Sequence, residues 1–104
     1  MTTKVALRSH HQLTPRLVEQ NLQLIAELKR IIEKFPDYPV LVGASRKSFI
    51  GKVLDIPGPN DRLNGSLAAA AIALWNGASV LRVHDVRETV ETIRTVTALR
   101  RART

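Results

Sequence analysis

Hydrophobic residues in the first third of the chain recur at a helical spacing. They occupy positions 17/18, 22, 24/25, 28, 31/32 and 35, which form a single stripe along a helix. Thr14 precedes Pro15, and this pair is typical of a helix start, because the hydroxyl can accept from a free backbone N–H and proline has none to lose. Pro36 ends the pattern, since the residue before a proline is disfavoured in a helical conformation. The sequence therefore predicts an amphipathic helix over residues 15–34.

Two later segments lack a helical spacing and are predicted to be strands. The first covers residues 38–43, is continuously apolar and lies between turn-forming residues, which is typical of a strand that is buried on both faces. The second covers residues 79–83. A weaker third strand is predicted over residues 3–7, followed by a loop over residues 8–13.

Two helices are predicted between the two clear strands. A short helix over residues 48–55 ends before a proline-rich turn. The next helix covers residues 62–76, with Asn60 or Asp61 as its N-cap and Gly77 at its C-terminal cap.

A last helix follows Asp85, which we expect to be its N-cap, with Glu88 three residues later as in a capping box. Its inner stripe is predicted to consist of Val86, Val90, Ile93 and Thr97. Strand and helix thus alternate along the chain. This alternation predicts an α/β protein built from βα units, in which the two clear strands are parallel neighbours joined by a helical crossover.

The composition narrows the class of protein. With 104 residues, 44% of them hydrophobic, the chain has the length of one globular domain. It contains no cysteine, which excludes disulfides and thiolate metal sites. Neither a signal-peptide pattern nor an apolar stretch of the roughly 18 residues that a membrane span needs is found. These features predict a soluble, cytoplasmic protein without a membrane partner.

The chain is strongly basic, with a formal net charge of +7. A positive field of this size attracts phosphate groups of any kind. Aromatic residues make up only 4% of the chain and do not alternate with basic residues, so no base-stacking surface and no nucleic-acid partner are expected. The basic residues near the C-terminus are interpreted as a solvated tail.

Candidate functional residues follow the two clear strands, where the active sites of βα proteins lie. Ser45–Ser48 follows the first strand, and Arg82 and His84 end the second. Since strand residues alternate between faces, Arg82 and His84 point the same way and together suit a phosphate. The alternative is that Arg82 only reaches toward solvent and that His84 binds a backbone carbonyl. Spacing alone leaves both interpretations open, and Ser45–Ser48 by itself is also compatible with a solvated loop.

No metal site is predicted from the residues themselves. His10 and His11 are adjacent but have no third ligand nearby in the sequence. Asp85 is interpreted as a helix cap rather than as an acid catalyst.

Three segments resemble signatures of the dihydropteroate synthase family, in the same order and at similar separations. Residues 39–51 (PVLVGASRKSFIG) are similar to the seventh-strand signature of that family, and residues 62–70 (RLNGSLAAA) to the helix that follows. Residues 82–86 (RVHDV), continuing through Glu88, resemble its eighth strand and last helix. The resemblance extends over residues 18–97, and it identifies the chain as a member of this family.

The resemblance implies a fold and a reaction. The family is a (β/α)8 TIM barrel that joins p-aminobenzoate to 6-hydroxymethyl-dihydropterin diphosphate, releases diphosphate and uses magnesium. On this comparison, residues 14–104 are the C-terminal part of such a pterin-binding domain, that is, a partial barrel. Residues 1–13 are then a weak strand or an irregular N-terminal segment.

The resemblance also implies roles for individual residues. Lys47 and Arg82 would contact the pterin, and Ser48 would hold the carboxylate of p-aminobenzoate. Arg82 and His84 would bind the phosphates, where preorganised cations stabilise the negative charge that develops on the departing diphosphate.

Parts of that site have no counterpart in the chain. A TIM barrel has eight strands and about 250 residues. The family's magnesium-binding asparagine and its pterin-binding carboxylates belong to earlier strands, whereas the first acidic residue here is Glu19. We therefore expect the chain to be inactive alone, and its open sheet edges to associate with another copy or with the missing barrel portion.

A different interpretation is a non-enzymatic basic binding module, or a protein-interaction fragment, built on the same scaffold. Convergence of Lys47, Arg82 and His84 in one pocket would favour the enzyme part, whereas a continuous basic face would favour the binding module.

Overall fold

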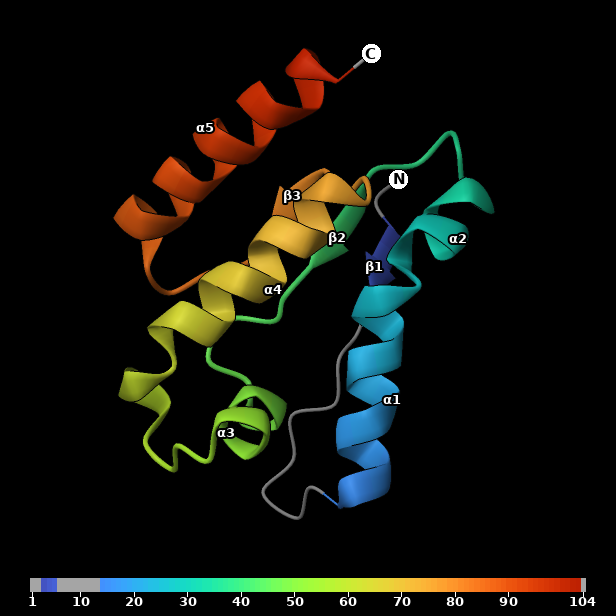
Figure 1. Ribbon diagram of the computed structural model, residues 1–104. Coiled ribbons are helices and arrows are strands. Elements are labelled where there is room, and N and C mark those ends of the chain that lie inside the picture. Colours follow the sequence, from blue (N-terminus) through green and yellow to red (C-terminus); the bar gives the residue numbers. More distant parts are fainter. Residues whose placement is uncertain (1–2, 6–13, 104) are drawn as a thin grey trace.

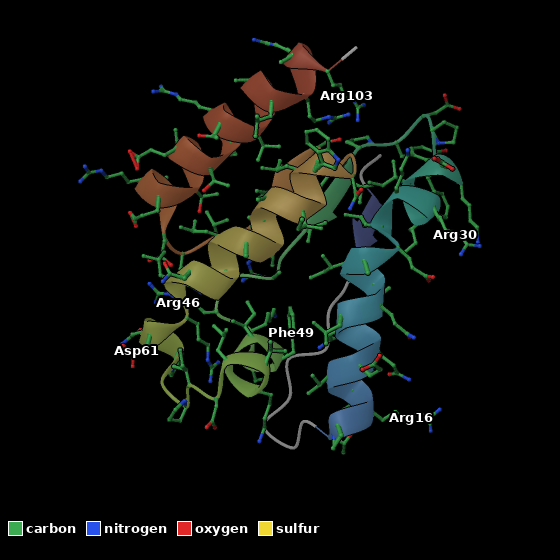
Figure 2. All side chains as sticks on the ribbon, in the orientation of Figure 1. Arg16, Arg30, Arg46, Phe49, Asp61 and Arg103 are labelled. Carbon is green, nitrogen blue, oxygen red and sulfur yellow. The ribbon has the colours of Figure 1, made fainter. Side chains whose placement is uncertain are left out.

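The computed structural model describes residues 3–5 and 14–103 (Figure 1), and Figure 2 adds the side chains of residues 14–103. The elements along the chain are β1 (Thr3–Val5), α1 (Pro15–Ala26), α2 (Leu28–Glu33), β2 (Val40–Val42), α3 (Ser48–Leu54), a 3-10 turn (Pro59–Asp61), α4 (Leu63–Trp75), β3 (Val80–Leu81) and α5 (Val86–Ala102). The predicted alternation of strands and helices is therefore present. The loop predicted over residues 8–13, with His10 and His11, lies outside the described residues.

The three strands form one parallel sheet in the order β1-β2-β3. Val5 lies opposite Val42, and Leu41 lies opposite Val80. The predicted parallel pairing of the two clear strands is confirmed, although both strands are shorter than predicted. Strands that are consecutive in the sequence are also neighbours in the sheet, as they are around a barrel, so the sheet is compatible with a partial barrel.

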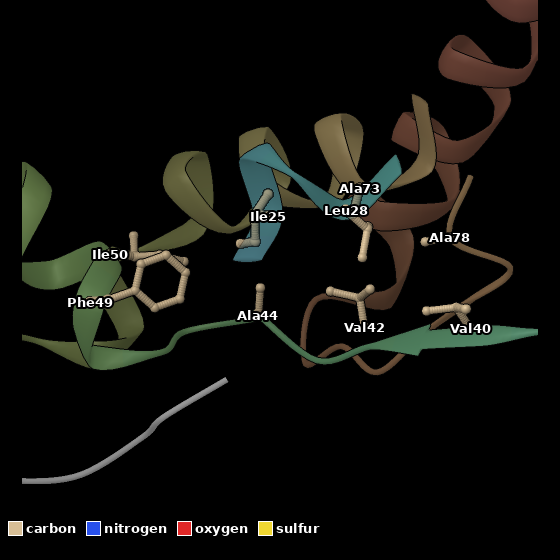
Figure 3. Packing of buried hydrophobic residues seen from close by; sticks show 9 residues of the cluster. All are labelled: Ile25, Leu28, Val40, Val42, Ala44, Phe49, Ile50, Ala73 and Ala78. Carbon is tan, nitrogen blue, oxygen red and sulfur yellow. The ribbon is translucent and has the colours of Figure 1, made fainter. Parts of the chain in front are cut away.

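The apolar core lies between the sheet and helices α1 to α4 (Figure 3). Val40 and Val42 point from β2 toward Leu28 and Ala73, and both helix residues have no exposed surface. Leu81 packs against the same cluster. Since strand residues alternate between faces, Val80 and Arg82 belong to the opposite face of the sheet, and Val80 is 42% exposed.

Helices α3 and α4 approach each other closely at Gly65. A Cβ atom at this position would overlap Cγ2 of Ile50 and would lie 3.0 Å from Cδ1 of Leu54. Side chains in a close-packed interior cannot absorb such an overlap without moving. The absence of a side chain at Gly65 therefore sets how near α3 lies to α4.

The single helix predicted over residues 15–34 is interrupted at Glu27. Helix α1 ends at Ala26 and α2 begins at Leu28, and Glu27 between them has a φ of −103° and a ψ of 15°. Neither a glycine nor a proline marks the break, and the apolar stripe continues across it, which is why the pattern predicts one helix. The N-cap is confirmed, because Thr14 Oγ1 accepts from the N–H of Leu17 at 3.2 Å.

The caps of α4 agree with the prediction at one end only. Asn60 and Asp61 lie in the 3-10 turn, and Arg62 takes the N-cap position without a side-chain hydrogen bond. The predicted N-cap is wrong because the side-chain oxygen of Asn60 accepts from Arg46 instead. At the other end Gly77 has a φ of +111°, as expected for a residue that terminates a helix.

The predicted inner stripe of α5 is wrong at three of its four positions. Val86, Val90 and Ile93 are exposed, Val86 to 62%, and Thr97 is half-buried, whereas Thr89 and Val96 are buried. The hydroxyl of Thr89 donates to the carbonyl of Asp85 at 2.6 Å, so its polar group is satisfied within the helix. A threonine paired in this way can pack on the alanine-rich α4, and the spacing of residues within α5 does not indicate this contact.

Candidate active site

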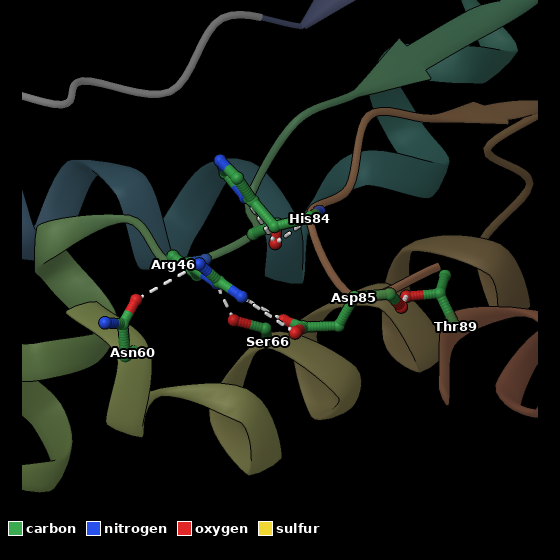
Figure 4. A network of polar contacts seen from close by, with 7 residues as sticks. Arg46, Asn60, Ser66, His84, Asp85 and Thr89 are labelled. Carbon is green, nitrogen blue, oxygen red and sulfur yellow. Dashed lines mark hydrogen bonds and ion pairs between the residues drawn. The ribbon is translucent and has the colours of Figure 1, made fainter. Parts of the chain in front are cut away.

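The segments that follow β2 and β3 lie beside each other at one end of the sheet (Figure 4). The backbone N–H of Arg82 donates to the carbonyl of Val42 at 3.0 Å, which continues the pairing of the strands up to the first predicted site residue. The N–H of His84 donates to Ser45 Oγ at 3.3 Å, and Nδ1 of its imidazole lies 3.0 Å from the same oxygen. Ser45 therefore holds His84 against the loop that follows β2.

Arg82 extends over Gly43, which directly follows β2. A Cβ atom at Gly43 would lie 3.5 Å from Cβ and 3.9 Å from Cδ of Arg82, so the arginine stem crosses above the glycine in ordinary contact. The side chain is exposed, and none of the described residues pairs with its guanidinium. Within the described residues, the cation is thus free to bind a ligand on the face of the sheet opposite the core.

Lys47 and Ser48 stand at the start of α3, where Lys47 takes the N-cap position. The Lys47 ammonium has no hydrogen-bond or ion-pair partner in residues 14–103, and the side chain is half-buried. Ser48 Oγ is buried and also lacks a partner there. Because buried hydroxyl groups are normally paired, this oxygen is available to a ligand. No hydrogen bond joins Lys47 to Arg82 or His84 in the described part of the chain, and their convergence on one ligand stays a prediction.

Arg46 connects three other segments of the site (Figure 4). Its backbone has a φ of +56°, in the left-handed region. Its N–H donates to Ser66 Oγ at 2.9 Å, and its carbonyl accepts from Nη1 of Arg62 at 3.0 Å. Its guanidinium donates to both carboxylate oxygens of Asp85, from Nη2 at 2.9 Å and from Nε at 3.3 Å, and to Asn60 Oδ1 at 3.2 Å.

The role predicted for Asp85 is corrected by this contact. The residue occupies the N-cap position of α5, but its side chain makes no capping hydrogen bond, because Arg46 takes both of its oxygens. The hydrogen bond from Arg46 lowers the pKa of the Asp85 carboxyl. Partial desolvation opposes this, and Coulombic attraction to Arg46 and His84 adds to it. The pair is therefore ionised at neutral pH.

Arg62 also holds the loop that contains Arg46. Its Nη2 donates to the carbonyl of Pro57 at 2.8 Å, in addition to the bond from Nη1 to Arg46. A Cβ atom at Gly51 would lie 2.6 Å from Nε of Arg62, so the glycine leaves room for the guanidinium. The sequence predicts no role for Arg46 or Arg62, because their contacts join segments that are distant along the chain.

The described residues of this site do not form a set of magnesium ligands. Among the residues that the structure describes, no group of three or more histidines, cysteines and carboxylates is placed to hold a metal ion. Mg2+ prefers carboxylate, carbonyl and water oxygens. The strand ends present Arg82 and His84, and the Asp85 carboxylate is engaged by Arg46.

None of the described helices is long and apolar enough to cross a bilayer.

Comparison with known proteins identifies the family. The profile of the family described as pterin binding enzyme matches residues 12–84. The chain belongs to this family. It is 60% identical over 60 residues to the dihydropteroate synthase of Escherichia coli (strain K12), an alignment that covers 58% of this chain and 21% of that enzyme. It is 42% identical over 84 residues to the enzyme of Synechocystis, covering 81% of this chain and 28% of that enzyme.

Solved structures of the family share the arrangement of elements. The dihydropteroate synthase of Yersinia pestis superposes with a TM-score of 0.76 at 46% identity, covering 82% of this chain and 39% of that chain. The enzyme of Vibrio fischeri superposes with a TM-score of 0.83 at 35% identity, covering 97% of this chain and 34% of that chain. The resemblance to dihydropteroate synthase is thus confirmed. The chain spans between a fifth and a third of the length of the curated relatives it matches.

Proposed function

We propose that this chain carries the diphosphate-binding part of a dihydropteroate synthase active site. The supporting observation is the placement of Arg82 and His84 at the end of β3, beside the loop that holds Lys47 and Ser48. The site would join p-aminobenzoate to 6-hydroxymethyl-dihydropterin diphosphate. Among the similar structures, the enzyme of Coxiella burnetii is in complex with pteroic acid.

We assign the proposed roles from the side-chain groups that lack a protein partner among the described residues. The guanidinium of Arg82 and the ammonium of Lys47 lack protein partners among the described residues, so both are open to pterin and phosphate groups. Ser48 Oγ would bind the carboxylate of p-aminobenzoate. As the amine forms a C–N bond and the C–O bond to diphosphate breaks, the negative charge collects on diphosphate. Arg82 and His84 are the groups that face this charge.

These 104 residues by themselves are expected not to catalyse the reaction. The amino and ring N–H groups of a pterin require acceptors such as carboxylates, and Lys47 has only donors. The Asp85 carboxylate lies close by, but Arg46 already occupies it. The function proposed for the chain alone is therefore binding, and turnover would require the remaining strands of a barrel.

Binding of inorganic diphosphate tests the proposal. Arg82→Ala is expected to weaken diphosphate binding about 10-fold or more, since a hydrogen bond to a charged group contributes roughly 1.5–3 kcal/mol. Titration calorimetry at fixed ionic strength measures the affinity. Arg94→Ala, on the exposed side of α5, removes the same charge and is the matched control. Equal weakening by both variants would indicate diffuse attraction and would favour the basic binding module instead.

We further propose that the chain associates through its uncovered sheet and helix surfaces, with a second copy or with a missing barrel portion. Within the described residues, β1 and β3 each pair on one side only, and Val80 and Val86 are exposed. Burying a few hundred Å2 of apolar surface contributes roughly 5–10 kcal/mol at about 25 cal/mol per Å2 before entropy costs. The charge of +7 opposes self-association at low salt and is screened within about 8 Å at physiological ionic strength.

Light scattering coupled to size exclusion is expected to show a homo-oligomer, most simply a dimer, at physiological salt. Lowering the salt should shift the equilibrium toward the monomer, because the screening of the like charges is lost. A stable monomer that melts cooperatively at high micromolar concentration would contradict this assembly.

A further inference from the structure

We propose that Arg46 is a positioning residue that locks the loop carrying Lys47 and Ser48 to the segment carrying His84. The inference rests on the proposed function, because its consequence is read out at the diphosphate site. It assigns to Arg46 a structural connection between two parts of the site rather than a contact with the ligand.

The backbone of Arg46 lies in the left-handed region. A φ of +56° is disfavoured for a residue with a Cβ atom and persists only where neighbouring groups hold it. Two groups from the start of α4 do so, since Ser66 Oγ accepts from the Arg46 N–H and Arg62 donates to the Arg46 carbonyl. This left-handed residue turns the chain between β2 and α3. It therefore determines where Lys47 and Ser48 begin the helix.

The guanidinium of Arg46 joins the two segments. It donates two hydrogen bonds to Asp85, whose carboxylate would otherwise cap α5. Asp85 directly follows His84, and Ser45, which contacts His84, directly precedes Arg46. The two segments are thus joined by two adjacent crosslinks, one between side chains of opposite charge and one between Ser45 and His84. Figure 4 shows the Arg46–Asp85 contact and the neighbouring His84.

The charges of Arg46 and Asp85 compensate each other. Because Asp85 neutralises Arg46, this arginine is not a free cation, unlike Arg82. Asn60 engages its remaining terminal nitrogen at 3.2 Å. Arg46 therefore acts on a bound anion through the position of its neighbours. Lys47 and Ser48 on one side and His84 on the other are expected to move together when the pair is broken.

The test uses two substitutions that change the charge in opposite directions and are both expected to weaken diphosphate binding. Arg46→Gln and Asp85→Asn are each expected to weaken the affinity of the 104-residue chain for inorganic diphosphate by at least 3-fold, measured by calorimetry. Asp85→Asn removes a negative charge, so an electrostatic effect alone would strengthen binding. The double variant is expected to bind no more weakly than the weaker single variant. Arg94→Gln, with the charge change of Arg46→Gln, is expected to lie near the wild type.

A second measurement does not depend on the ligand. Amide and side-chain NMR signals of Lys47, Ser48 and His84 are expected to shift in the unliganded Asp85→Asn variant. A merely local role for Asp85 would leave the Lys47 and Ser48 signals in place. If Arg46→Gln fails to fold, Arg46→Lys replaces it, since lysine keeps the charge and loses the two-pronged contact.

The outcomes separate the two proposals. Tighter or unchanged diphosphate binding by Asp85→Asn, or additive effects in the double variant, would overturn the positioning role. If Arg82→Ala leaves diphosphate affinity unchanged, the proposed function fails, and the NMR signals alone decide on Arg46. In that case, shifts of Lys47 and Ser48 in Asp85→Asn support the connection, and their absence overturns it.

Discussion

Replacing Leu28 with alanine is expected to leave the chain largely unfolded at 25 °C. Leu28 has no exposed surface and stands at the centre of the cluster that joins α1, α2 and β2. Loss of a buried leucine side chain lowers the free energy of unfolding by about 2–5 kcal/mol, because the removed methyl groups are no longer buried and a cavity takes their place. The free energy of unfolding of a whole domain is only about 5–15 kcal/mol, and a partial sheet lies toward the lower end. Circular dichroism during urea titration measures the change.

Leu99→Ala is the matched control for this experiment. The chemical change is the same, but Leu99 is 57% exposed on the last turns of α5. The free energy of unfolding is expected to change by less than about 0.5 kcal/mol, as at surface positions generally. If the two variants unfold at the same urea concentration, Leu28 is not a core residue and the packing described here is wrong.

Catalytic turnover is expected only when the chain is combined with the missing part of a barrel. A suitable partner is the dihydropteroate synthase of Escherichia coli (strain K12), truncated before the region that aligns with this chain. Neither part alone should release diphosphate from the pterin substrate, and the mixture should do so. In the mixture, Arg82→Ala is expected to lower kcat/KM by about 10²–10³-fold, the effect of removing one group that stabilises developing negative charge.

Two results would contradict this expectation. Turnover by the chain alone that is lost in Lys47→Ala would mean that the described residues assemble a complete site. Turnover of the mixture that is insensitive to Arg82→Ala would mean that Arg82 does not face the departing diphosphate. Arg94→Ala in the same mixture is the control for loss of positive charge.

The elements of the fold could be predicted because their signals are local. The stripe that ends at Pro36, the cap at Thr14 and the glycine at position 77 each depend on a few neighbouring residues. The family was also recognisable, since three short segments carry it. The break at Glu27 has no such signal, because it involves neither glycine nor proline and leaves the apolar spacing intact.

The connections inside the site could not be predicted, because they join residues that are distant in the sequence. Arg46 and Asp85 are separated by 39 positions, and nothing in either segment indicates the other as its partner. Local rules instead made Asp85 a cap and Asn60 a cap, and in both cases Arg46 takes the side-chain oxygen. The face of α5 was assigned wrongly for a related reason, since burial of Thr89 depends on the small residues of α4.

The close approach at Gly65 links the size of one α4 residue to the geometry of the whole site. Ser48 moves with α3, whereas Arg82 and His84 belong to the segment that follows β3. A larger residue at position 65 would displace α3 by its contacts with Ile50 and Leu54. Because Arg46 joins the start of α3 to Asp85, part of this displacement would reach His84. A change at a position without a proposed ligand contact can therefore alter the groups proposed for p-aminobenzoate and for diphosphate together.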